Sequence, residues 1–209
     1  MYSTSFGGLL AAALIAAPLI AAPLAHGAAA SGQYVTCDEI AKGASAQPSG
    51  DGAQENWQTM AKVVCSSIER MRQMSSIETK AEQDEIHRLY QTAVDGRALR
   101  LRAVPSCVSQ TVADGDVEAR VVKIVRGFIM KNGNTLQQSA AVRIMAAARW
   151  PEKLEGEVDT GQGDPVPVAW LFRCRSSSDC KIIDIQVTGS LSMTESIRGD
   201  LSTTAHCAK

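Results

Sequence analysis

Apolar residues in the first half of the chain recur at intervals of three and four, which is the period of an amphipathic helix. The clearest run spans residues 55–74, and a charged segment at about 76–94 predicts a second helix. Ser75 and Glu78 form a capping-box pattern before that second helix, and Gly96 is suited to end it. The apolar positions of the first run are Trp57, Met60, Val64, Ile68 and Met71.

A third apolar stripe, over residues 116–130, fits a helix. A strand is the alternative there, because valine and isoleucine dominate its central part. Residues 97–112 and 140–148 are compatible with either type of element. Residues 42–54 have the Gly, Ser and Pro content of a flexible loop.

The last third of the chain alternates between apolar and other residues with a period of two, which predicts strands. A short polar loop, residues 175–179, separates two such segments, so they form a β-hairpin. The apolar positions are Val166, Val168, Trp170 and Phe172 in the first strand, and Ile183, Ile185 and Val187 in the second.

The register of this hairpin follows from burial. If Trp170 faces Ile183 or Ile185, the apolar residues of both strands share one face. Placing Cys174 directly opposite Cys180 without any irregularity mixes the two faces. A disulfide between these cysteines therefore requires a one-residue bulge near the tip, and we favour that pairing because the hairpin holds both residues close.

The first thirty residues carry no Lys, Arg, Asp or Glu and end in the small residues Ala28–Ala30. This pattern predicts a cleaved secretory signal over residues 1–30, with an uncleaved membrane anchor as the alternative. Pro18 and Pro23 disfavour a continuous membrane helix. A flexible N-terminal segment at 31–54 and a single domain at 55–209 follow.

The charge balance limits the possible binding partners, and the cysteine content indicates the cellular compartment. The chain has 21 Lys and Arg against 22 Asp and Glu, without a basic cluster, so we expect no nucleic-acid partner. All six cysteines follow the predicted signal, so up to three disulfides and an oxidising location outside the cytoplasm are expected. No C-x-x-C spacing occurs, so we expect no metal site and no cofactor.

The expected fold class is α+β, with N-terminal helices packed on a curved C-terminal antiparallel sheet. A sheet with one apolar face must be covered, and the amphipathic helices are the available cover.

The C-terminal pattern resembles the MlaC (toluene-tolerance) family of periplasmic phospholipid-binding proteins. The likeness begins with a proline-led strand at residues 165–170. It continues with the pattern Lys-aliphatic-x-Asp-aliphatic-x-aliphatic-x-Gly at residues 181–189 and ends with Ser192-Met193, Arg198 and Asp200-Leu201. The resemblance covers about residues 157–201. It implies a carrier that moves phospholipid between membrane-bound lipid-transport complexes, with an apolar pocket between helices and sheet.

The candidate lipid-binding wall combines the inner faces of the hairpin and the first helix, and an ordinary filled core is the alternative for the same residues. That alternative makes the protein a secreted, disulfide-stapled interaction module without a ligand cavity. No enzyme is expected, because no catalytic motif occurs. The wall residues are Val166, Val168, Trp170, Ile183, Ile185, Val187, Val64 and Ile68.

Overall fold

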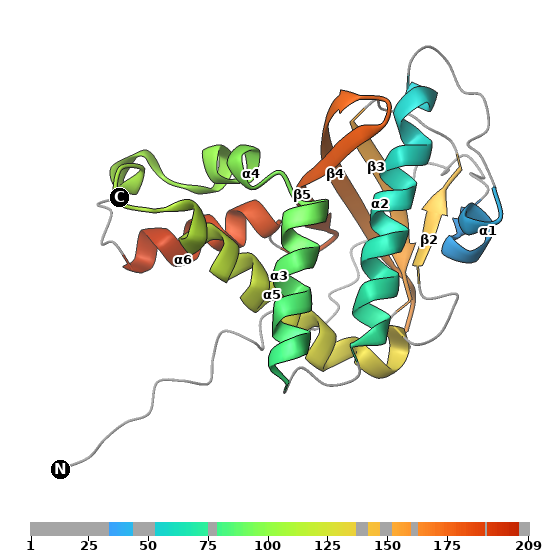
Figure 1. Cartoon of the computed structure of the whole chain (residues 1–209), viewed down its shortest axis with the longest axis horizontal. Coiled ribbons are helices and arrows are strands. Elements are labelled where there is room, and N and C mark those ends of the chain that lie inside the picture. The colour runs from blue at the N-terminus through green and yellow to red at the C-terminus, as the bar shows by residue number, and fades with distance from the viewer. Residues whose placement is uncertain are drawn as a thin grey trace, which may run out of the picture. The chain divides into compact units, whose positions relative to one another are not determined.

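The computed structural model describes residues 34–43, 53–74, 79–136, 142–146, 152–159, 163–190 and 192–204. All of them belong to one compact unit, Gly32–Lys209, in which helices precede most of the sheet (Figure 1). The predicted signal segment and most of the predicted loop lie outside the described residues. The helices are α1 (Cys37–Ala41), α2 (Ala53–Gln73), α3 (Lys80–Ala93), α4 (Gly96–Ala103), α5 (Asp114–Leu136) and α6 (Met193–Thr204), with a 3-10 turn at Ser106–Val108.

The first two predicted helices are present as α2 and α3. Helix α3 begins one turn later than predicted, because its capping box uses Thr79 and Glu82. The Thr79 hydroxyl accepts the Glu82 N–H at 3.3 Å, and the Glu82 carboxylate accepts the Thr79 N–H at 3.1 Å. The Ser75–Glu78 pattern lies outside the described residues. Gly96 does not end α3 but opens α4, whose N-cap is Asp95.

The third stripe forms α5, so the helix prediction is confirmed and the strand alternative is wrong. The region left open at 97–112 contains α4 and the 3-10 turn. The other region left open, residues 140–148, contains a strand. Residues 193–204 form α6.

Five antiparallel strands form one sheet in the order β1-β2-β3-β4-β5, and the sheet is not strongly curled. The predicted hairpin is confirmed as β4 and β5, whereas β1 and β3 were not predicted. The strands are β1 (Tyr34–Thr36), β2 (Val142–Met145), β3 (Lys153–Val158), β4 (Val166–Ser176) and β5 (Asp179–Val187).

The hairpin register contains the predicted disulfide and the predicted bulge. Trp170 faces Ile185, and Cys174 faces Cys180, to which it is disulfide-bonded. The register shifts between Leu171 and Phe172, so Ile183 is left without a partner in the β4–β5 pairing. In consequence Ile182, rather than Ile183, occupies the apolar face opposite Phe172. A second irregularity, between Cys174 and Ser176, lies near the tip, where the bulge was expected.

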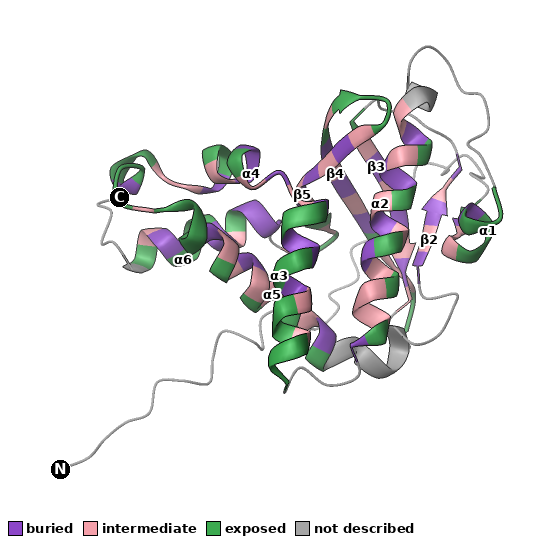
Figure 2. Cartoon of the chain, in the orientation of Figure 1, coloured by how far each residue is buried: buried purple, intermediate pink, exposed green. Residues whose placement is uncertain are grey.

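Helix α2 lies across this apolar face, and its inner residues are almost fully buried (Figures 1 and 2). Gly156 in β3 leaves room there for the Trp170 ring, because an added Cβ at residue 156 would lie 3.0 Å from Cζ3 of that ring and closer still to the Arg143 carbonyl oxygen. The largest side chains of this sheet core are Trp57, Met60, Leu154, Trp170 and Phe172.

A second hydrophobic cluster, the helical core, joins helices α3 to α6. Its buried members are Tyr90, Leu99, Ala103, Val117, Val121, Met193, Ile197 and Leu201. The junction between α3 and α4 pairs with the edge of β5, where the Asp95 N–H donates to the Ile182 carbonyl oxygen at 2.9 Å. Ile185 packs against both cores, so β5 connects them.

Candidate functional site

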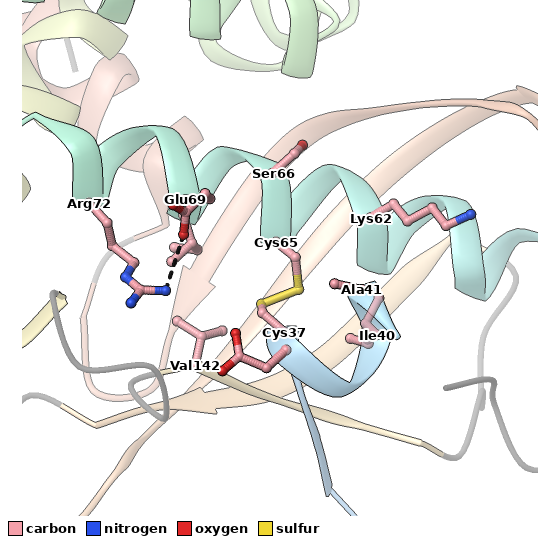
Figure 3. A pocket seen from close by; sticks show the side chains of 11 residues that line it. Cys37, Ile40, Ala41, Lys62, Cys65, Ser66, Glu69, Arg72 and Val142 are labelled. Carbon is pink, nitrogen blue, oxygen red and sulfur yellow. Dashed lines mark hydrogen bonds and ion pairs between the residues drawn. A yellow bond between two sulfur atoms is a disulfide. The ribbon is translucent and has the colours of Figure 1, made fainter. Parts of the chain in front are cut away.

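A cavity near the sheet core is a half-open groove between α1 and α2, with β2 at its base (Figure 3). Its volume is about 400 Å³. Ile40 and Val142 are only 2 % exposed and belong to the sheet core, so the groove opens onto the same apolar layer that α2 covers. We call this cavity the α1–α2 groove.

A disulfide between Cys37 and Cys65 holds the groove in shape. It joins the first residue of α1 to the middle of α2, and both residues line the cavity. Helix α1 starts at a capping box in which the Thr36 hydroxyl accepts the Glu39 N–H at 3.3 Å. The backbone N–H of Thr36 and its hydroxyl hold the pKa of the Glu39 carboxyl below its usual range. This short helix therefore depends on its cap and on the disulfide.

Charged side chains line the outer part of the groove. The Arg72 guanidinium donates to the Glu69 carboxylate at 3.1 Å, and Figure 3 shows this pair on the groove side of α2. Lys62, which precedes both residues on α2, and Asp38 of α1 complete the charged lining. The groove thus combines an apolar base with both cationic and anionic groups.

The predicted wall residues divide into four groups. Val64, Val168 and Trp170 are buried in the sheet core, with exposures of 1 %, 8 % and 5 %. Ile185 and Val187 are partly buried against it, while Val166 and the bulged Ile183 are intermediate in burial. Of the eight residues, Ile68 lines the α1–α2 groove.

Sequence reasoning missed the groove residues Ile40 and Val142. The pairing of Cys37 with Cys65 would have pointed to Ile40, because it places α1 against α2, whereas Val142 lies in β2. Those cysteines are separated by 28 residues, and spacing alone does not reveal such a pair.

Within the described ranges, no group of three or more His, Cys, Asp or Glu side chains is arranged to hold a metal ion. None of the helices described is both long enough and apolar enough to cross a membrane. The disulfides Cys37–Cys65 and Cys174–Cys180 indicate an oxidising compartment outside the cytoplasm.

Comparison with known proteins gives no family assignment. No protein-family model matches the sequence, and no curated protein matches it.

Proposed function

We propose that the protein is a periplasmic phospholipid-binding carrier, exported by a cleaved signal, that exchanges lipid with membrane-bound transport complexes. The observation that carries the proposal is the α1–α2 groove, whose apolar base is continuous with the sheet core. The order of residues in β4, β5 and the start of α6 resembles the MlaC family and points in the same direction.

The groove suits an acyl chain on physical grounds. Its volume of about 400 Å³ falls within the range of about 300–1,000 Å³ that is usual for ligand pockets. Each methylene group withdrawn from water contributes about 0.8 kcal/mol, so even a partly enclosed chain is held firmly. Ile68, Ile40 and Val142 provide the apolar contact.

The cationic groups suit the other end of the same ligand. Arg72 and Lys62 lie on α2 around the apolar base, where a phosphate oxygen would find charged donors. A chain longer than the groove would continue between α2 and the sheet, against Val64, Val168 and Trp170, which requires α2 to move away from β4. No catalytic group is needed for this function.

Native mass spectrometry of the mature protein, purified from a bacterial periplasm, tests the proposal. We expect about one copurifying phospholipid per chain. Ala41→Trp fills the groove and should reduce that occupancy at least tenfold, because Ala41 is exposed and lines the cavity. Gln58→Trp, at an exposed position of α2 outside the groove lining, is the matched control.

Two results would count against the proposal in different ways. A protein that stays free of lipid after incubation with phospholipid vesicles is not a carrier. A lipid that Ala41→Trp retains in full lies elsewhere, and the layer between α2 and the sheet becomes the site to map.

A secreted interaction module is the second candidate, and the filled sheet core favours it. Trp57, Met60 and Phe172 leave that layer closely packed, as in a protein that needs no internal ligand. If the protein stays free of lipid after incubation with phospholipid vesicles, the interaction module becomes the better-supported function.

A further inference from the structure

A second cavity, of about 320 Å³, lies where the end of α4 meets β5 and the start of α6. It shares no lining residue with the α1–α2 groove, and most of its lining is polar or charged. We propose that this cavity, the α4–α6 pocket, binds the phosphate group of a phosphate ester. The inference goes beyond the carrier proposal and does not depend on it.

One buried hydroxyl in this pocket lacks a partner. Thr194 lines the cavity and is 4 % exposed, and among the described residues its Oγ1 has no hydrogen-bond partner. A buried hydroxyl without a partner is unfavourable, so its retention points to a group that completes it. The backbone N–H of the same residue is already satisfied by the Asp184 carboxylate at 2.9 Å.

The two acidic side chains of the pocket are directed to backbone donors. Asp184 accepts the N–H groups of Ile185 and Thr194, both at 2.9 Å. Glu195 accepts the Ser192 N–H at 2.8 Å as part of the α6 cap. These bonds and the positive end of the helix offset part of both negative charges.

The two basic side chains, in contrast, are both exposed and lie together on the lining. Arg198 of α6 donates to the backbone carbonyl oxygen of Arg102 at the end of α4, and this bond holds the two arginines close to each other. Two guanidinium groups beside hydroxyl donors match a tetrahedral phosphate better than a planar carboxylate, because phosphate offers more acceptor oxygens.

The nearby Asp184 carboxylate also sets the charge of the ligand. A phosphate diester, with a single negative charge, is repelled less by Asp184 than a dianion is. The polar lining admits a phosphate with a glycerol-sized substituent and leaves acyl chains outside. The ligand is therefore either a soluble phosphate ester or the head group of a lipid at a membrane surface.

Isothermal titration of the mature chain with glycerophosphoglycerol tests the soluble source, and cosedimentation with phosphatidylglycerol vesicles tests the membrane source. Phosphatidylcholine vesicles serve as the neutral comparison. Saturable binding in either assay is expected, and Arg102→Gln or Arg198→Gln should weaken it at least tenfold. Arg97→Gln, an exposed position of α4 outside the pocket, should leave it unchanged.

Thr194→Val separates a ligand-binding role from a structural one. It removes the unpaired hydroxyl, so it should raise the Tm of the ligand-free protein while weakening phosphate-ester binding. The proposal is overturned if neither assay shows binding, or if binding is insensitive to both Arg102→Gln and Arg198→Gln. Because the two cavities share no lining residue, such a failure leaves the lipid measurement on the α1–α2 groove unaffected.

Discussion

The indole N–H of Trp57 donates to the backbone carbonyl oxygen of Met145 at 2.9 Å and thereby joins α2 to β2. Trp57 is 1 % exposed, so the bond lies at the end of a buried ring. It fixes where the N-terminal part of α2 crosses the sheet.

Replacing Trp57 with phenylalanine should lower the free energy of unfolding by about 2–4 kcal/mol, from the lost hydrogen bond and the lost ring volume. Met60→Leu, a nearly volume-conserving change one turn along the same helix, should cost less than about 1.5 kcal/mol. Urea denaturation followed by circular dichroism measures both. Equal costs for the two variants would show that the Trp57 bond contributes nothing.

Gly156→Ala and Gly127→Ala should change stability in opposite directions. At residue 156 an added methyl group meets the Arg143 carbonyl oxygen and the Trp170 ring, so we expect a loss of about 1–3 kcal/mol. Gly127 lies exposed in α5 with open space around it, and alanine there should stabilise by about 0.5–1 kcal/mol. Thermal unfolding of both variants measures the changes, and a destabilised Gly127→Ala would contradict the expected open position.

The disulfides Cys37–Cys65 and Cys174–Cys180 should differ in their contributions to stability. Cys37–Cys65 closes a loop of 28 residues, and its replacement by serines should cost about 3–4 kcal/mol in the chain-entropy model. Cys174–Cys180 spans six residues within a hairpin, and its removal should cost about 2 kcal/mol. Denaturant titration of the two double-serine variants ranks them. The reverse order would mean that the hairpin needs its disulfide for more than loop closure.

Ionisation of Tyr90 should lower the free energy of unfolding at high pH. Burial in the helical core, followed by the negative charges of Glu118, Asp114 and Asp95, raises the pKa of Tyr90 from 10.0 to about 12. The unfolded chain ionises first, so this contribution is complete below pH 10 and is lost as the pH rises toward 12. The free energy of unfolding of the wild type and of Tyr90→Phe, measured between pH 10 and 12, tests this contribution. Parallel pH profiles of the two proteins would exclude the effect.

Elements with a clear period were predictable from the sequence. The stripe from Trp57 to Met71 gave α2, and the alternation around Trp170 gave β4 and its pairing with Ile185. The boundary of α3 was missed because two capping patterns follow each other closely, and the one at Thr79 begins the helix. Strand β3 was missed because its glutamates and lysine form ion pairs on the open face, such as Lys153–Glu155 at 2.7 Å.

The cavities were harder to predict because they depend on contacts between distant segments. Ile68 was named as a wall residue, but its partners Ile40 and Val142 lie in α1 and β2, far before and far after it in the sequence. Asp184 of β5 accepts the Thr194 N–H of α6, a contact between segments that no local pattern connects. The position of the bulge decided that Ile182, rather than Ile183, joins the core, and no local pattern distinguishes these two isoleucines.

The position of β5 between the two hydrophobic cores has a consequence for how the protein loses its structure. Its Ile182 carbonyl oxygen is held by the Asp95 N–H, and its Ile185 side chain contacts both cores. Loosening α4 and α6 therefore exposes the edge of the sheet at the same time. The helices and the sheet are coupled into one cooperative unit, and a disturbance at the α4–α6 pocket reaches the strand that packs beneath α2.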